Sequence, residues 1–374
     1  MIYLFTAFFG TYFIFHIILL IGVFRIPVSK RIQNEFPLVS ILLSCRNEEN
    51  DISRCMRSLE NLDYPKDRLQ VIMIDDFSTD STPSILCEAE KKNTHFEFYQ
   101  SSDFPSTHLE AKARGIENAA SKANGEWLFI TDADCEIPPT WLLHMLDGVD
   151  KNTGIITGAM DTLNPHFTGT LERLASLGKL VFAYGIAGYG VSAFALGPNM
   201  AIRKSVYDEA GGLKKADFRI AEDIALFKLS HDLGYKTKYH FDHFTRVRST
   251  PVSTFKQLNS QQIRWMKGGF EGERSHAIEA IILIIALIFL SAFIGIGYLF
   301  FIDTTLATTL ILLKSTAETM LLSVYWKRLK AKRLFRLLPI AALYSLYITI
   351  WLPFATFIKK KTEWMGEGYV VRYE

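Results

Sequence analysis

The 374-residue sequence has few cysteines, and none of them lies in a metal-binding or disulfide-forming pattern. Its four cysteines, Cys45, Cys55, Cys87 and Cys135, include no Cys-x-x-Cys pair, so neither a zinc cage nor a disulfide framework is indicated. We expect reduced thiols that are mostly buried. The sequence also lacks a nucleophile elbow, a phosphate-binding P-loop and a Gly-x-Gly-x-x-Gly run, so it carries no signature of the enzyme classes that these motifs mark.

A strong excess of charge is missing as well. The 41 Lys and Arg residues nearly balance the 39 Asp and Glu residues, for a net charge of +2, so nothing indicates nucleic acid as a bulk partner. Apolar residues are abundant instead, at 49% of the chain with 28 Phe, and they concentrate at the two ends. This content exceeds that of a typical soluble enzyme.

The first apolar stretch, residues 1–23, contains no charged residue and is followed by Arg25, Lys30 and Arg31. Roughly 20 apolar residues are enough to span a bilayer. A cleaved signal peptide would have a basic stretch before the apolar one and a small-residue cleavage site after it, and neither is visible. We therefore expect residues 1–24 to form a retained transmembrane anchor in contact with membrane lipids.

Further apolar stretches predict a C-terminal membrane region of two to three helices over residues 277–358, ahead of a tail at 359–374. These stretches are residues 277–302, 304–325 and 337–358. The second is the weakest span because it carries Lys314 and Glu318, which lie four positions apart and either pair with each other or face another helix.

Clusters of Lys and Arg predict the orientation of the chain in the membrane. Those at 25–31, 327–336 and 359–361 mark cytoplasmic flanks, so we expect an integral protein of the cytoplasmic membrane whose middle region faces the cytoplasm. Three full C-terminal spans cannot place all of these basic clusters on the cytoplasmic side. We therefore expect one of the three segments to lie in the membrane interface or to form a re-entrant segment.

In the middle region, residues 37–274, short apolar runs alternate with amphipathic segments, which predicts βαβ units and a largely parallel sheet. The expected strands are 38–44, 69–76, 96–100, 126–134 and 153–160, and the expected helices start after Asn50 and Asp51 or cover 80–86, 109–123, 139–149 and 221–235. The apolar segment 180–197 contains four glycines and fits a flexible, partly buried loop or helix pair better than a membrane span.

Carboxylates follow two of the expected strands. Asp75 and Asp76 end the second strand, and Asp132 and Asp134 end the strand at 126–134. Because parallel strands end at one edge of a sheet, these side chains should converge on one crevice. Asp-x-Asp alone is weak evidence, since a surface turn also favours Asp. After a buried strand, it suits Mg²⁺ or Mn²⁺, which bind one or two carboxylates together with substrate phosphates.

Two other patterns have both a functional and a structural interpretation. Glu222 and Asp223 begin an amphipathic helix, where they either act chemically or complement the helix dipole. Gln261-Gln262-Ile263-Arg264-Trp265 either binds a ligand or marks an interfacial belt at lipid headgroups. His231, His240 and His243 are expected to be structural, with His231 on the exposed part of a helix.

Six motifs in this order resemble a membrane-anchored family 2 glycosyltransferase. They are VSILLSCRNEEN, VIMIDDFSTDST, TDADCEIPP, GPNMAIRKSVYDEAGGL, AEDIALFKL and QQIRW. The resemblance implies a GT-A fold over residues 37–274, a Rossmann-like α/β fold with a mostly parallel mixed sheet. It also implies inverting transfer of a sugar from a nucleotide-sugar donor, UDP-linked, to a lipid-linked or growing glycan acceptor, with a divalent cation as cofactor.

The resemblance also implies a role for each matching residue. On the donor side, Ser44, Glu48 and Asp76 would contact the uridine with support from Asp75, Lys112 would lie near the phosphates or sugar, Asp132 would contact the donor, and Asp134 would hold the metal. On the acceptor side, Asp223 would be the general base, and Glu222, Gln261, Arg264 and Trp265 would lie at the diphosphate and acceptor channel.

Three alternatives remain open at this point. A processive polysaccharide synthase would also extrude its product and would need C-terminal spans that line a polar path. A catalytically silent membrane scaffold would keep the fold for binding, although every acidic position that the chemistry needs is present. A hydrolase with paired carboxylates would need an acid and a base flanking a water-accessible bond, and would have no use for a nucleotide-binding Asp pair.

Overall fold

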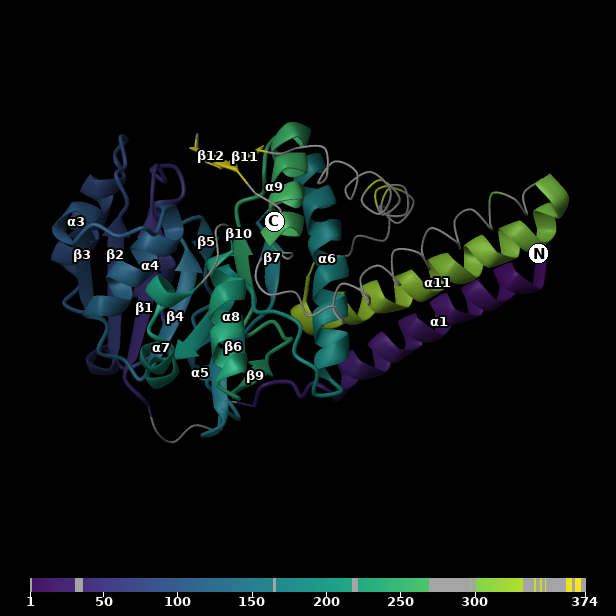
Figure 1. Ribbon diagram of the computed structural model, residues 1–374, viewed down its shortest axis with the longest axis horizontal. Coiled ribbons are helices and arrows are strands. Elements are labelled where there is room, and N and C mark those ends of the chain that lie inside the picture. Colours follow the sequence, from purple (N-terminus) through teal and green to yellow (C-terminus); the bar gives the residue numbers. More distant parts are fainter. Residues whose placement is uncertain are drawn as a thin grey trace. The chain divides into compact units, whose positions relative to one another are not determined.

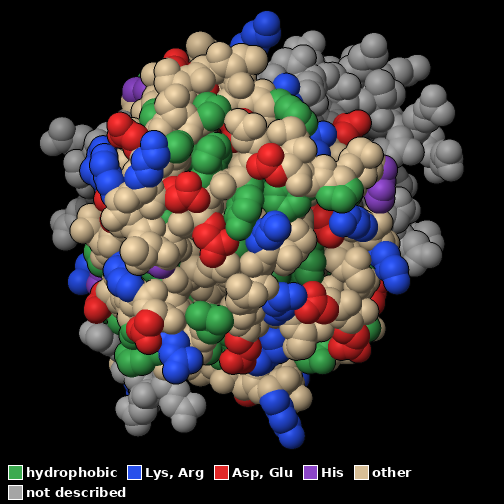
Figure 2. Space-filling model, turned by 90° about the vertical axis from the view of Figure 1, so that its left-hand side faces the viewer, with side chains coloured by type: hydrophobic (Ala, Val, Ile, Leu, Met, Phe, Trp, Pro, Cys, Tyr) green, Lys and Arg blue, Asp and Glu red, His purple; other side chains and the backbone are tan. Residues whose placement is uncertain are grey.

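The computed structural model of the protein describes residues 2–30, 36–163, 166–216, 221–268, 297, 301–331, 340, 344, 347, 361–364 and 367–370. The chain divides into two compact units. We call Met1–Ile26, His166–Val191 and Val252–Glu374 the helical unit, and Pro27–Pro165 and Ser192–Pro251 the sheet unit. Figure 2 shows acidic, basic and apolar side chains interspersed on the face that it draws, which agrees with the small net charge.

The sheet unit contains a seven-stranded mixed sheet (Figure 1) with the order β3-β2-β1-β4-β8-β6-β9. Its strands are β1 (Val39–Cys45), β2 (Leu69–Asp75), β3 (Phe96–Gln100), β4 (Trp127–Asp132), β6 (Thr153–Thr157), β8 (Met200–Arg203) and β9 (Lys236–Tyr239). Of these seven, β8 alone runs against the others. The expected α/β fold with a mostly parallel mixed sheet is therefore confirmed.

A smaller sheet pairs β5 (Cys135–Glu136), β10 (Val247–Ser249) and β7 (Met160–Thr162) in this order. The expected strand 153–160 thus divides between two sheets, since its first part is β6 and its last residue begins β7. Gly158 lies at the break, where an added Cβ would be 2.6 Å from Asn199 Nδ2. The chain therefore needs a glycine to pass this asparagine.

Helices cover both faces of the main sheet, because its central strands are apolar on both sides. One face packs against α2 (Ile52–Glu60), α3 (Thr82–Lys92) and α5 (Trp141–Met145), and the other against α4 (Ala111–Lys122), α7 (Lys204–Ala210) and α8 (Glu222–Asp232). Neighbours on β1 serve different cores: Ile41 and Leu43 join the first and Leu42 the second.

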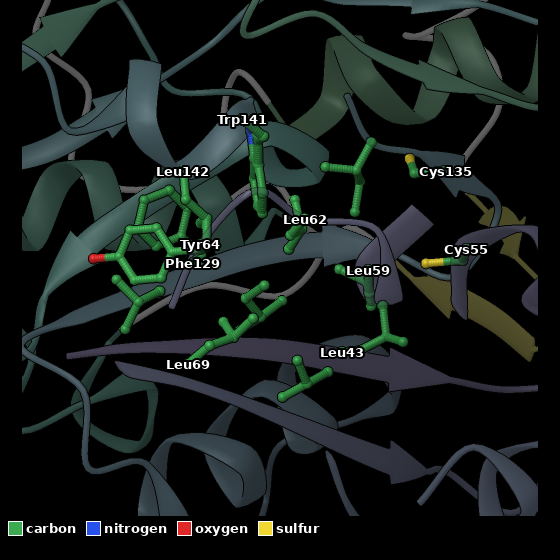
Figure 3. Packing of buried hydrophobic residues seen from close by; sticks show 14 of the residues in the cluster. Leu43, Cys55, Leu59, Leu62, Tyr64, Leu69, Phe129, Cys135, Trp141 and Leu142 are labelled. Atoms are coloured by element: carbon green, nitrogen blue, oxygen red, sulfur yellow. The ribbon is translucent and has the colours of Figure 1, made fainter. Parts of the chain in front are cut away.

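Aromatic packing anchors the first of these cores. Figure 3 shows Trp141 of α5 lying close to Phe129 of β4, and their ring centroids are 4.9 Å apart in an edge-to-face arrangement. Cys55 and Cys135 belong to the same core. All four cysteines are free and three of them are buried, so the prediction that the thiols are mostly buried is confirmed.

The order of the strands creates a switch point in the sheet. From β1 the chain proceeds to β2 and β3 on one side, and α4 then carries it to β4 on the other side of β1. In open α/β sheets, ligands bind outside the carboxyl ends of strands at such a reversal. The ends of β1 and β4 therefore mark the expected crevice.

The helical unit contains α1 (Ile2–Arg25), α6 (Phe167–Ala187), α9 (Phe255–Gly268), α11 (Thr304–Leu329) and the hairpin β11 (Lys361–Trp364) and β12 (Glu367–Val370). Helices α1 and α11 lie side by side (Figure 1). Helix α6 packs closely on α1 through glycines. A Cβ on Gly22 would be 1.8 Å from the Gly185 carbonyl oxygen, and one on Gly188 would be 1.9 Å from that of Gly22.

None of the helices in the described part of the chain is both long enough and apolar enough to cross a membrane. The expected anchor at 1–24 and the expected span at 304–325 are therefore not supported. Nearly all of the expected stretches 277–302 and 337–358 lies outside the described residues, as do the side chains of Lys314 and Glu318.

Two further expectations differ from the structure. The helix expected over 139–149 is shorter, because α5 ends at Met145 and Gly148 reverses the chain with φ +64°. Segment 180–197 is half helix and half loop: its first half completes α6, and the rest is a loop that leads to a 3₁₀ turn at Gly197–Asn199. Gly185 serves close helix packing there rather than flexibility.

Candidate active site

Polar side chains from adjacent strands meet at the carboxyl edge of the main sheet. Ser44 at the end of β1 is in register with Asp132 of β4, and the next residue, Cys45, is in register with Asp75 of β2. Ser44 also lies against α4, since a Cβ on Gly115 would be 2.1 Å from Ser44 Oγ. The parallel order thus places both Asp pairs at the switch point.

Lys112 of α4 bridges two carboxylates at this edge. Its Nζ lies 2.6 Å from Asp132 Oδ1 and 2.9 Å from Glu222 Oε1, so the ammonium joins β4 to the first turn of α8. Burial works against the charge of Lys112, but Asp132 and Glu222 outweigh it and raise its pKa above the usual range. The preceding residue, Ala111, has φ +44°, a strained value for alanine.

Asp223 lies beside this bridge. Its Oδ2 accepts the backbone N–H of Gly197 at 2.9 Å, and its Oδ1 accepts that of Ile224 at 2.9 Å. Burial, reinforced by Glu222, raises the pKa of Asp223 to about 6, although Lys112 opposes the shift. Because general bases work best with a pKa near the working pH, this carboxylate is suited to accept a proton.

Gly197 keeps the space beside these charges open. An added Cβ would lie 3.0 Å from Asp223 Oδ2 and 3.3 Å from Lys112 Nζ, closer than most Cβ contacts. A side chain at this position would therefore crowd both groups.

Neighbouring carboxylates at the edge disfavour the negative charges of Glu48 and Asp134. Burial raises the pKa of Glu48 to about 8, with Asp134 and Asp132 adding to the shift. Burial followed by Asp132 raises the pKa of Asp134 to about 7. The single charge of Lys112 does not balance the carboxylates at this edge. A divalent cation would neutralise the negative charge that remains.

The residues at this edge fit a hard cation that is completed by a ligand. No cluster of three or more His, Cys, Asp or Glu side chains able to hold a metal occurs within the described ranges. Mg²⁺ and Mn²⁺ need no such cage, since one or two carboxylates with substrate phosphates and water suffice. Asp134 can supply such an oxygen ligand.

The backbone of Asp134 is fixed by residues that the sequence did not single out. Its carbonyl oxygen accepts Arg54 Nη2 at 2.8 Å and the backbone N–H of Thr250 at 3.2 Å. The Asp51 carboxylate, which directly precedes α2, accepts Arg54 Nη2 and Thr250 Oγ1, each at 2.7 Å. No sequence signal indicates this arrangement, because Thr250 is about 200 positions from Asp51.

The Asp75–Asp76 pair consists of one partly paired and one fully paired carboxylate. Asp76 accepts Arg114 Nε at 2.7 Å and Arg114 Nη2 at 2.8 Å, and its Oδ1 also accepts Ser101 Oγ at 2.7 Å. Asp75 Oδ2 accepts the Ser78 backbone N–H at 3.3 Å, whereas its buried Oδ1 has no hydrogen-bond partner among the described residues. Asp75 is therefore the better placed of the two to accept a bond from a ligand.

The loops after β1 and β2 hold each other in place. Asn47 donates its backbone N–H to Ser78 Oγ at 3.0 Å, and its Oδ1 accepts the backbone N–H of Thr79 at 2.8 Å. Asn47 and Phe77 have φ values of +55° and +61°, which are uncommon for side-chain-bearing residues. Backbone strain of this kind concentrates at functional sites.

The remaining predicted site residues lie on α9 in the helical unit. The Nε2 amide of Gln261 donates a hydrogen bond to Glu172 Oε1 at 2.8 Å. The centroid of the Trp265 ring lies 3.6 Å from Lys179 Nζ. Arg264 also lies on α9. The role of these residues over the diphosphate and acceptor stays a prediction.

Similar proteins identify the family. A profile described as glycosyl transferase family 21 matches residues 5–374. The probable glycosyltransferase YdaM of Bacillus subtilis is 28% identical over 68% of this chain and 62% of the relative. The beta-monoglucosyldiacylglycerol synthase of Nostoc sp. is 26% identical over 70% of this chain and 57% of the relative. Both matches thus cover less than two thirds of the relative's own length.

A solved structure has the same fold. The structure of a mannosyltransferase from Pyrobaculum calidifontis in complex with GDP-Man and Mn²⁺ superposes with a TM-score of 0.57 at 17% identity, covering 93% of this chain and 96% of that chain. The predicted resemblance to family 2 glycosyltransferases is confirmed, and the chain belongs to glycosyl transferase family 21.

Proposed function

We propose that the protein is an inverting, metal-dependent glycosyltransferase that uses a nucleotide-sugar donor, UDP-linked, and a lipid-associated or growing glycan acceptor. The observation that carries this proposal is the group of carboxylates around Lys112 at the switch point of the sheet. It combines Asp134, which has the chemistry of a metal ligand, with Asp223, which has that of a general base. Family membership supports sugar transfer as the reaction.

The donor subsite is proposed at the ends of β1, β2 and β4. Asp75 Oδ1 is a buried acceptor without a partner among the described residues, so it suits a polar hydrogen of the nucleoside. Ser44 and Glu48 lie at and after the end of β1, and Asp132 at the end of β4. Asp76 would act by holding Arg114 of α4 and Ser101 after β3 in place.

In the reaction, Asp223 would take the proton from the attacking acceptor hydroxyl. A single displacement at the anomeric carbon then inverts its configuration and needs no covalent enzyme intermediate. A Mg²⁺ or Mn²⁺ ion held by Asp134 would supply charge neutralisation at the departing diphosphate. Lys112 would hold Asp132 and Glu222 in place beside the base.

The location is proposed to be the cytoplasmic face of the membrane. Apolar side chains on α1 that are exposed in the structure support contact with lipid, namely Ile14, Ile17, Ile18, Ile21 and Phe24. A glycolipid or lipid-linked acceptor fits this location, and a relative named as a beta-monoglucosyldiacylglycerol synthase supports it.

The proposal is tested with the full chain purified in detergent. UDP- and GDP-sugars are incubated with Mn²⁺ or Mg²⁺, diacylglycerol and short glycans, and nucleotide release and transfer are measured. Asp223→Asn should lower transfer by about 10²- to 10⁴-fold, the usual contribution of a general base. Asp208→Asn is the matched control, because Asp208 is 57% exposed and pairs with Lys204 one turn earlier on α7. Transfer that is indifferent to EDTA and to Asp223→Asn contradicts the mechanism.

A further inference from the structure

The 3₁₀ turn at Gly197–Asn199 carries the backbone N–H that binds the proposed general base. Gly197 donates this N–H to Asp223 Oδ2 at 2.9 Å. The turn begins the segment GPNMAIRKSVYDEAGGL, which belongs to the family resemblance but has no assigned role. What holds the turn in place therefore also decides whether Asp223 keeps this hydrogen bond.

The side chain of Asn199 joins the turn to three other segments of the sheet unit. Asn199 is fully buried. Its Oδ1 accepts Trp141 Nε1 of α5 at 2.8 Å. Its Nδ2 donates to the carbonyl oxygens of Ala159 and Thr245 at 2.7 and 2.8 Å. An indole N–H only donates and carbonyl oxygens only accept, so these partners require the two donors and the acceptor of an amide.

The end of β6 holds the backbone of the same turn. Thr157 Oγ1 donates to the Asn199 carbonyl oxygen at 3.2 Å and accepts the backbone N–H of Leu196 at 3.1 Å. The Asn199 carbonyl oxygen also accepts the backbone N–H of Gly158 at 3.0 Å. Thr157 is 1% exposed, so water does not compete for these bonds. The residues on both sides of Gly197-Pro198 are therefore fixed.

The pattern of backbone donors leaves Gly197 to face Asp223. The N–H of Leu196 is bound by Thr157, and that of Asn199 donates to the Leu196 carbonyl oxygen at 2.8 Å. Pro198 has no N–H. Because close-packed interiors transmit small displacements, a shift of Asn199 would also move the Gly197 N–H away from the carboxylate.

This N–H affects how readily Asp223 accepts a proton. Burial raises the pKa of Asp223, and Glu222 on the same helix adds to the shift, whereas Lys112 of α4 and the N–H groups of Gly197 and Ile224 oppose it. The Ile224 N–H belongs to α8 and moves with Asp223. Gly197 thus adds a stabilising contact from outside α8, beside that of Lys112.

We propose that Asn199 and Thr157 are positioning residues for Asp223, because they hold the turn that keeps the Gly197 N–H on its carboxylate. The inference rests on the proposed function, in which Asp223 takes the proton of the acceptor hydroxyl. A hydrogen bond to the charged carboxylate favours its charged form. With the turn in place, more of Asp223 is therefore available as a base at neutral pH.

The first test follows the protonation of Asp223 by infrared spectroscopy of the full chain in detergent with EDTA and without substrate. The difference from the same chain carrying Asp223→Asn isolates the carboxyl band of this residue, whose midpoint is expected at about pH 6 in the wild type. Asn199→Asp replaces the amide donor with an oxygen, and Thr157→Val removes both bonds of the hydroxyl. Each should raise the midpoint by about one to two pH units, as expected for a lost hydrogen bond to a charged group.

Gln70→Glu is the matched control, because Gln70 is a buried amide with a similar set of bonds near the amino end of β2. Its Oε1 accepts Ser40 Oγ at 2.6 Å, and its Nε2 donates to Glu97 Oε1 at 2.8 Å. This substitution should lower the melting temperature without moving the Asp223 midpoint.

An unchanged midpoint in either Asn199→Asp or Thr157→Val overturns the proposal when that variant has the wild-type circular dichroism spectrum. If one of the two does not fold, the other decides. A midpoint that moves equally in Gln70→Glu also overturns it, because the shift would then reflect general destabilisation.

The pH profile of sugar transfer separates this proposal from the proposed function. The acid limb of kcat/KM reports the essential base of the free enzyme, so it should move to higher pH together with the infrared midpoint in both variants. If the midpoint moves and the acid limb does not, Asp223 is positioned by the turn but is not the general base. That result would contradict the proposed function alone.

Discussion

Removing the Lys112 ammonium should destabilise the sheet unit markedly. Lys112→Met keeps much of the side-chain volume but leaves Asp132 and Glu222 without the cation that lies 2.6 and 2.9 Å from them. Both carboxylates lie in a region that already contains the charges of Asp134 and Asp223. The variant therefore adds an unpaired, partly buried charge to an acidic site.

The size of the effect follows from burial. Breaking a buried ion pair by removing one partner costs about 3–5 kcal/mol. Glu222 and Lys112 are 12% and 16% exposed, but Asp132 is 31% exposed and keeps some contact with water. We therefore expect the lower end of the range, about 3 kcal/mol, which corresponds to a fall in melting temperature of about 6–12 °C for a unit of this size.

The assay is thermal unfolding followed by tryptophan fluorescence at about pH 8 and about pH 5. Lys112 lowers the pKa values of Asp134 and Asp223, which are about 7 and about 6, so its loss costs most where both carboxylates are charged, and the deficit of Lys112→Met should shrink as the pH falls to 5. Lys92→Met is the control: Lys92 and Glu88 are 68% and 72% exposed and 3.4 Å apart, so their pair is worth less than about 1 kcal/mol. A loss below about 1 kcal/mol at pH 8, or one that is independent of pH, would refute the reasoning.

Two further predictions concern packing and pH. Gly185→Ala should destabilise the protein by about 1–3 kcal/mol, because its Cβ would lie 2.7 Å from Leu19 Cδ2 and 3.0 Å from Leu19 Cα. Gly178→Ala on the same helix meets nothing within 4 Å and should stabilise it by about 0.5–1 kcal/mol. Burial lowers the pKa of His240 to about 4, partly opposed by Asp242, so the unfolded state binds the proton more readily. Stability should therefore fall by up to about 3 kcal/mol as the pH drops from about 6.5 to 4, and His240→Gln should flatten this part of the profile. Thermal unfolding measures all three variants.

Each of these predictions has an outcome that contradicts it. If Gly185→Ala and Gly178→Ala shift the melting temperature alike, the close contact of α6 with α1 is wrong. An unchanged acid limb in His240→Gln would mean that other groups, chiefly carboxylates, account for the loss of stability in acid.

The central strands could be predicted from the sequence because their signal is local. β1, β2 and β4 are continuous apolar runs, and each is followed by polar residues that end the strand. Parallel order then requires both Asp pairs to share one edge, which is where Ser44 and Asp132 stand in register. Pattern and topology thus suffice for this part of the site.

The partners of these carboxylates could not be predicted, because they come from distant segments. Arg114 reaches Asp76 across 38 positions, and nothing in the Asp75–Asp76 dipeptide indicates which carboxylate it selects. The hydrogen bonds to the Asp134 carbonyl oxygen likewise involve Thr250, which is 116 positions away. Side-chain pairing of this kind is decided by tertiary packing.

The glycines of segment 180–197 were misleading for a related reason. Local composition favours a flexible loop, but Gly185 lies within α6 at a close helix crossing. Glycine permits either outcome, and only the neighbouring helix decides between them. The contact of Lys179 with Trp265 was also invisible, since it joins a lone lysine in an apolar helix to α9.

The most direct test of the proposed donor site is the affinity for UDP with and without Mn²⁺, measured by calorimetry on the wild type and Asp134→Asn. If Asp134 holds a cation against the diphosphate, Mn²⁺ should tighten UDP binding by about tenfold or more in the wild type and have little effect in the variant. Glu136→Gln is a suitable control, because Glu136 pairs with Arg248 on the neighbouring strand. UDP binding that is equally tight in EDTA, or equally dependent on Mn²⁺ in Asp134→Asn, would contradict the account.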